Sequence, residues 1–203
     1  MSENTNYYFN KGELEKINLK IRNYIMEKLY ERIFPRASDI LDNKIYLNSL
    51  KLSWTEPKHY LKKEIIGINN NNFDFKRFVS EMKILIMNVE KEKVPLKKVE
   101  LIYNIIEIMD KCFTNRKISY GQDFFKNLLI YTIVKAKPNW LHSNCLFIKV
   151  FIENHTNKTG ESMLEILNDA CNFFNDISHK SLLNVQEKEF NEKCEKSFHE
   201  IDG

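Results

Sequence analysis

Histidine and cysteine, the side chains that most often bind metals, are few and widely spaced in this chain. The five histidines show no HxxxH or HExxH spacing, and the four cysteines form no CxxC pair. Zinc ligands come at such short spacings, so we expect no metal site. We interpret the cysteines as buried free thiols in a reducing compartment, with one disulfide as the alternative. They are Cys112, Cys145, Cys171 and Cys194.

Patterns for other kinds of chemistry are also missing from the sequence. There is no glycine-rich phosphate loop and no plausible catalytic triad, which argues against a metabolic enzyme. The pairs Lys62-Lys63 and Lys97-Lys98 lie near aromatic residues, so an unrelated helical nucleic-acid binder is one hypothesis. The ordinary interpretation of each pair is a solvated helix face. Because Lys and Arg exceed Asp and Glu by only 31 to 28, we expect no nucleic-acid partner.

The composition predicts one globular domain. The chain has 203 residues, of which 43% are hydrophobic, and only 5 Gly and 4 Pro. This length supports a core of useful size, and so few Gly and Pro argue against a turn-rich all-β fold. No segment approaches the ~20 apolar residues that span a bilayer, and the N-terminus lacks an apolar signal-peptide core. We therefore expect a cytoplasmic protein without a transmembrane segment.

Helical periodicity dominates the chain, and no useful length alternates with period two. The sequence thus predicts an all-α, single multi-helix domain. In the first helix, apolar residues from Leu14 to Leu29 form a stripe that we expect to face inward. Residues 124–134 are apolar nearly all round and predict a central buried helix. The asparagine run Asn69 to Asn72 predicts a loop. The expected helices cover residues 14–33, 40–50, 75–89, 95–113, 124–134, 143–151, 162–173 and 185–198.

One segment has a sequence motif that is more specific than a buried helix alone requires. Residues 123–151 read DFFKNLLIYTIVKAKPNWLHSNCLFIKVF. This segment resembles the core of the Vps-nine (vacuolar protein sorting nine) domain, where an acidic residue and an aromatic precede a run like LIYxxxKAxPxxLxSNxxYIxxF. Three other segments agree in order with that family: Leu29 to Pro35, Val94 to Lys98, and Ser181 to Phe190. The resemblance covers residues 27–190 and implies the fold of these Rab guanine nucleotide exchange factors, with a preceding helical layer.

The resemblance also implies an activity, the promotion of GDP release from an early-endosomal Rab-family small GTPase. In the family an acidic finger does this, and it aligns with Asp123. Such a carboxylate repels the β-phosphate, competes for the P-loop lysine and disfavours the magnesium ion. No covalent bond changes, so no nucleophile and no cofactor is needed. The alternative role for Asp123 is an ordinary N-cap of the helix that follows it.

The resemblance further implies partner-binding residues, and three of them depart from the family. Phe124 follows the finger, as in the family. Asn127 stands where the family usually has Pro, Ser162 where it has Tyr, and Glu165 where it has Thr. A divergent Rab partner would explain these changes, and so would a catalytically weakened Rab-binding module without exchange activity. Tyr131 and Asn144 match the family, either as residues that position the core or as contacts.

The expected organisation has two parts. Residues 1–26 are an N-terminal helical lead-in, and residues 27–203 are the exchange-factor domain with its closing C-terminal helix. The expected partner is a Rab-family GTPase, GDP-bound or nucleotide-free. We expect a monomer that acts in endocytosis and vesicle trafficking and is recruited peripherally to endosomal membranes.

Overall fold

The computed structural model describes residues 10–34, 40–61, 75–114, 122–152 and 158–199. Within these ranges the chain is all-α and has no strand, as the sequence predicted. The asparagine run and the pair Lys62-Lys63 lie outside the described residues. The α-helices are α1 (Lys11–Ile33), α2 (Ile40–Lys51), α4 (Phe75–Lys91), α5 (Pro95–Thr114), α6 (Gln122–Ala136), α7 (Leu141–Ile152), α8 (Lys158–Asn172) and α9 (Glu187–His199), and the short 3-10 turns are η1 (Pro57–His59), η3 (Phe173–Asn175) and η4 (His179–Ser181).

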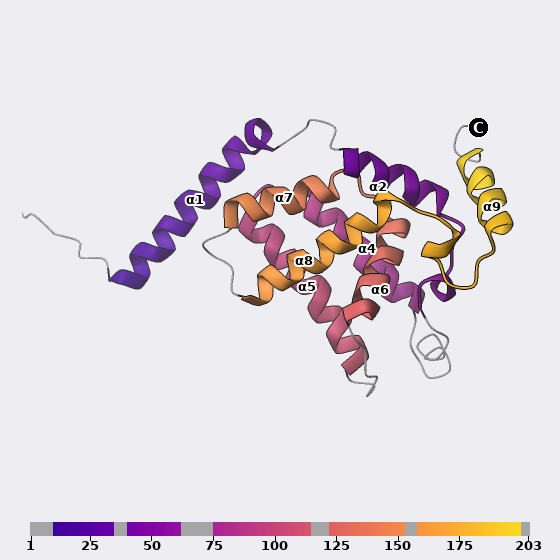
Figure 1. The fold of residues 1–203 in the computed structure, drawn as a ribbon. Coiled ribbons are helices and arrows are strands. Elements are labelled where there is room, and N and C mark those ends of the chain that lie inside the picture. Colours follow the sequence, from indigo (N-terminus) through magenta and orange to yellow (C-terminus); the bar gives the residue numbers. More distant parts are fainter. Residues whose placement is uncertain (1–9, 35–39, 62–74, 115–121, 153–157, 200–203) are drawn as a thin grey trace, which may run out of the picture.

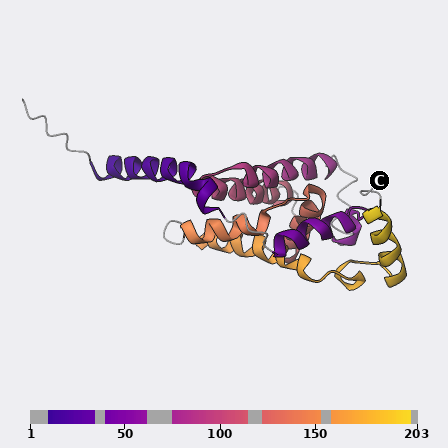
Figure 2. The ribbon, with the colours of Figure 1, turned by 90° about the horizontal axis from the view of Figure 1, so that it is seen from above.

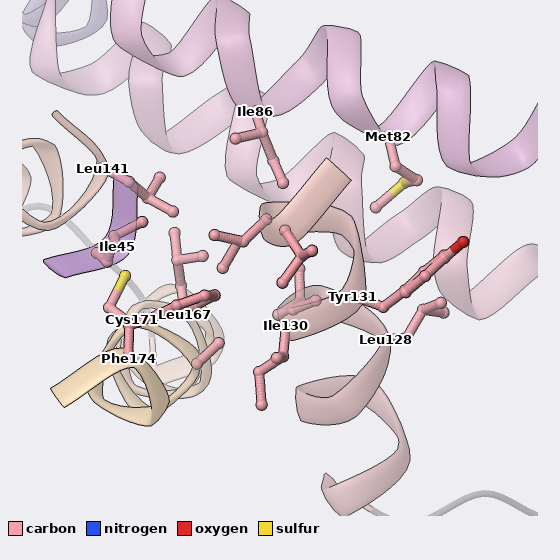
Figure 3. Close-up of a cluster of buried hydrophobic side chains, with 14 of the residues drawn as sticks. Ile45, Met82, Ile86, Leu128, Ile130, Tyr131, Leu141, Leu167, Cys171 and Phe174 are labelled. Atoms are coloured by element: carbon pink, nitrogen blue, oxygen red, sulfur yellow. The ribbon is translucent and has the colours of Figure 1, made fainter. Parts of the chain in front are cut away.

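Helix α6 is the centre of the packing. It contacts α2, α4 and α8, while α5 packs on α4, α7 and α8 (Figure 1). Its side chains Leu128, Ile133 and Val134 are fully buried, which confirms the central buried helix expected from its apolar sequence. Figure 3 shows α6 side chains meeting Met82 and Ile86 of α4 and Leu167 of α8. These packed side chains form a platform that anchors α6 in the core.

Helix α1 differs from its prediction. An Asn10–Glu13 capping box starts the helix, and it then runs away from the rest of the molecule (Figures 1 and 2). Its apolar stripe was expected to face inward, and that expectation is wrong. Leu14, Ile21 and Ile25 are 47%, 51% and 46% exposed. Periodicity identifies an apolar face of a helix, but it does not say what covers that face.

Only the C-terminal end of α1 packs on the other helices. Tyr30 and Phe34 stack with ring centroids 4.8 Å apart, and both meet the ring of Phe147 on α7. Met26 is the first side chain to pack against this cluster. The helix passes through residue 26 without a break, so the expected division at 26/27 corresponds to the start of packing rather than to a linker.

Candidate functional site

Asp123 is the second residue of α6, inside its first turn. Its side chain is 91% exposed, and Lys126 Nζ lies 3.5 Å from Asp123 Oδ1. The next residue, Phe124, is only 6% exposed and belongs to the core. The buried ring fixes the first turn while the carboxylate projects into solvent. Because the N-terminal end of a helix dipole favours negative charge, this is a suitable place to present a carboxylate.

Asp123 shares a face of α6 with Asn127 and Ile130, since these residues follow at steps of four and three. Asn127 and Ile130 line an open pocket of about 380 Å³ between α6, α8 and the two 3-10 turns that follow α8. The pocket therefore lies one helical turn, about 6 Å along the axis, from the candidate finger. Its lining residues are Lys126, Asn127, Ile130, Asp169, Phe173 and Ser181.

The other two candidate residues lie on α8, which packs directly on α6. Ser162 and Glu165 are both exposed. Glu165 precedes Asp169, which lines the pocket, by four residues, and Ser162 precedes it by seven, so all three share one face of α8. The structure thus places Asn127 at the pocket and Ser162 and Glu165 one to two turns beyond it on the neighbouring helix. Phe124 is buried in the platform beneath them and supports the first turn.

Three carboxylates lie on this surface, those of Asp123, Glu165 and Asp169. Among the described residues, Asp169 and the ammonium group of Lys126 are the charged groups that line the pocket. Among those residues, no group of three His, Cys, Asp or Glu side chains is placed to hold a metal ion. The arrangement presents an exposed carboxylate beside an open pocket that has both polar and apolar lining residues. Such a surface can repel anions or attract a cationic group of a partner.

The side chains of two residues that match the family motif are buried in the core. Asn144 is fully buried, where its Oδ1 accepts a hydrogen bond from Lys98 Nζ and its Nδ2 donates to the Trp140 carbonyl at 2.7 Å. Tyr131 is 8% exposed, and its ring lies 5.4 Å from that of Tyr60. Of the two roles considered for these residues, the observed burial favours positioning of the core.

Sequence reasoning missed the role of Lys98. It was interpreted as part of a solvated helix face, but its side chain is fully buried. Its ammonium donates to the Val89 carbonyl at 2.7 Å and lies over the rings of Tyr30 and Phe34. Burial lowers the pKa of Lys98 to about 8. The sequence did contain a signal for this burial. Lys98 lies four residues before Ile102, on the same face of α5, and Ile102 is buried.

Helix α7 holds Asn144 in place, and its start was also misjudged. The sequence predicted Ser143 as its N-cap, but the helix begins at Leu141. The buried carboxylate of Asp42, on α2, accepts hydrogen bonds from the backbone N–H groups of His142 at 2.7 Å and Ser143 at 3.1 Å. A carboxylate 100 residues away therefore satisfies the free N–H groups of this helix end.

Comparison with known proteins connects this geometry with a family. Residues 80–178 match the model of the Vacuolar sorting protein 9 (VPS9) domain, which is the Vps-nine domain of the sequence resemblance. The matched range runs from within α4 to the segment before η4, and it contains Asp123, Phe124, Asn127, Ser162 and Glu165. The resemblance inferred from the motifs is therefore confirmed over this range, which is just under half of the chain.

Curated relatives extend the similarity to nearly the whole chain. Vacuolar protein sorting-associated protein 9A of Arabidopsis thaliana is 27% identical over 94% of this chain and 37% of its own length. The protein of the same name from Oryza sativa subsp. japonica is 26% identical over 90% of this chain and 38% of its own. Vacuolar protein sorting-associated protein vps901 of Schizosaccharomyces pombe is 25% identical over 94% and 35%. The chain spans little more than a third of the length of these relatives.

None of the described helices combines the length and the apolar character needed to cross a bilayer.

Proposed function

We propose that this chain is a guanine nucleotide exchange factor that promotes GDP release from an early-endosomal Rab-family GTPase. At the level of the family, the VPS9 match and the VPS9-type relatives support an exchange role toward Rab GTPases in vacuolar protein sorting. The observation that carries the proposal is Asp123, an exposed carboxylate on the first turn of the most buried helix, within the matched residues.

The proposed mechanism is electrostatic. The GTPase holds GDP through its phosphate-binding loop, a lysine and a magnesium ion. When Asp123 enters that site, its negative charge repels the β-phosphate, attracts the lysine and makes the magnesium position less favourable. Each ~1.4 kcal/mol removed from the release barrier raises the rate about tenfold. The rigid core under Phe124 matters because a fixed carboxylate keeps its position while it displaces a charged ligand.

The partner surface in this proposal is the exposed face of α6 and α8. Asn127 lies at the pocket, and Ser162 and Glu165 stand beyond it, where the family has Tyr and Thr. These residues set which GTPase fits. The complex forms with the GDP-bound or nucleotide-free GTPase at an endosomal membrane, to which the protein is recruited peripherally.

The test is the release of a fluorescent GDP analogue from a panel of Rab GTPases from the same organism. We expect Asp123→Asn, which removes the charge and keeps the size, to lower the acceleration at least about tenfold. Glu187→Gln is the matched control, because Glu187 is an exposed carboxylate in the first turn of α9. Full acceleration by a folded Asp123→Asn protein would contradict the finger mechanism.

The departures from the family favour a second candidate function. Ser162 and Glu165 replace an aromatic and a neutral side chain on the exposed face of α8, and aromatic residues often dominate binding energy. A Rab-binding module without exchange activity would capture a nucleotide-free GTPase and leave GDP release unchanged. Failure to capture any nucleotide-free GTPase of the panel would count against both functions.

A further inference from the structure

The exposed face of α1 is a surface that the proposed function does not use. Leu14, Ile17, Ile21, Ile25 and Leu29 are each between 37% and 51% exposed, and Tyr24 is 62% exposed. At about 100° per residue, this stripe points roughly 140° away from Met26, Tyr30 and Ile33, which dock on the other helices. Helix α1 thus has two apolar faces, and the described part of the chain covers only the one at its C-terminal end.

The length of unsupported helix indicates that this face has a partner. Residues 11–25 precede Met26, the first hydrophobic side chain of α1 that packs against the aromatic cluster. Isolated helices of about 12–15 residues are marginal in water and take most of their stability from packing. Yet this helix begins at a complete capping box, with two hydrogen bonds of 2.9 Å between Asn10 and Glu13. The sequence therefore specifies a helix that needs a second surface along its outer face.

We propose that this surface is α1 of a second copy of the chain, packed antiparallel about a two-fold axis near residue 23. The stripe is self-complementary in this arrangement. Ile21 of one copy lies beside Ile25 of the other, and Ile17 lies beside Leu29, each pair occurring twice. A two-fold contact of this kind, in which the same patch faces itself, is the commonest interface in homo-oligomers.

The charges beside the stripe favour the antiparallel orientation. Lys20 and Glu27 are seven residues apart and lie on one flank of the stripe. In the antiparallel pair the same flanks face each other, so Lys20 of each copy meets Glu27 of the other. In a parallel pair, the flank that carries Lys20 would face the other flank of the second copy, which does not carry Glu27. Lys20 would then not reach Glu27. The docked face of α1 points roughly 140° away from the contact, so each body lies on the side of its own helix opposite to the second copy.

The size of the contact predicts a weak dimer. Residues 14–32 span about 27 Å of helix, which places the contact below the ~800 Å² per partner of a standard interface. Lys28 and Arg32 are exposed and lie within the stripe, so their positive charges weaken the pair further. We therefore expect dissociation in the micromolar range. This inference does not depend on exchange activity, and it replaces the monomer that the sequence led us to expect.

The first arm of the test is sedimentation velocity of the full chain from about 1 to 200 μM, a range that brackets a micromolar dissociation constant. We expect a reversible monomer–dimer equilibrium that Ile21→Glu weakens at least about tenfold. The control Ile84→Glu makes the same change at a 58% exposed isoleucine of α4 and should leave the equilibrium as in the wild type. A wild-type chain that stays monomeric over the whole range overturns the proposal.

The second arm tests whether the partner is α1 of a second copy and whether the two helices are antiparallel. Lys20→Glu and Glu27→Lys each place like charges opposite one another, so each variant alone should associate less than the wild type. Their mixture restores opposite charges in both pairs and should associate more tightly than either variant alone. No gain on mixing overturns the antiparallel pair. A monomeric wild type that binds phosphatidylserine vesicles through Ile21 would assign the face to a membrane and also overturn the proposal.

Discussion

Lys98 shows how a single buried charge connects the helices. Its ammonium is satisfied by the carbonyl of Val89 and by Oδ1 of Asn144, and it lies 5.1 Å from the centroid of the Tyr30 ring. Through these contacts one side chain of α5 joins α4, α7 and the docked end of α1. A buried charge is costly unless it is paired in this way. The family residue Asn144 therefore acts here as an acceptor for Lys98, inside the core rather than at a partner surface.

The titration of the buried lysines gives a prediction about pH. Burial lowers the pKa of both Lys98 and Lys135 to about 8, against 10.5 for an exposed lysine. Between these values each of the two lysines binds more protons in the unfolded chain than in the native one, so its contribution to the free energy of unfolding rises with pH. We expect this rise between pH 8 and about 10 in urea unfolding. It should be smaller in Lys98→Met, which removes one of the two groups. An equal rise in both proteins would contradict the assignment to Lys98.

The residues of the candidate site were predictable to different degrees. Asp123 and the residues on its face could be found because the family motif is continuous there. The roles of Phe124 and Lys98 could not, because sequence gives the type of a side chain but not its burial. Phe124 follows the finger in sequence, yet its ring turns into the core. Lys98 looks like half of a surface lysine pair, yet only Lys97 is exposed.

At the scale of the element, α7 depends on a cap from a distant helix. Asp42 is 1% exposed and accepts hydrogen bonds from the first turn of α7. Sequence reasoning can find caps that are adjacent to a helix, so it proposed Ser143 for this one. The α6 prediction was confirmed because its apolar residues surround the helix, whereas the α1 stripe was misassigned because nothing local says what covers it.

The distant cap predicts a stability effect. Asp42→Ala leaves N–H groups of α7 without a partner inside the core. We expect it to lower the free energy of unfolding by roughly 2–3 kcal/mol in urea unfolding at neutral pH. Asp176→Ala is the control, because that exposed aspartate follows η3 and should change stability by less than about 0.5 kcal/mol. An equal loss of stability in the two variants would show that Asp42 does not stabilise the protein by capping α7.

At the scale of the whole molecule, the chain consists of a packed body and one projecting helix. The body carries the VPS9 match and the candidate site on α6 and α8. Helix α1 joins it through the aromatic cluster of Tyr30, Phe34 and Phe147, with an ion pair of 2.9 Å between Lys93 and Glu31 at the side. Figure 2 shows how little of α1 lies against the other helices. The orientation of α1 relative to the body therefore depends on this cluster and on the ion pair beside it.

Loss of the cluster should release α1 without unfolding the body. Phe147→Ala removes the ring on which Tyr30 and Phe34 pack, a change that costs about 3–5 kcal/mol when the side chain is buried. Because the large core is separate from this cluster, we expect faster amide hydrogen exchange in residues 26–34 and unchanged protection in α6. Exchange that rises equally in both segments would show instead that α1 and the body unfold as one unit, and the docked end of α1 would then belong to the cooperative core.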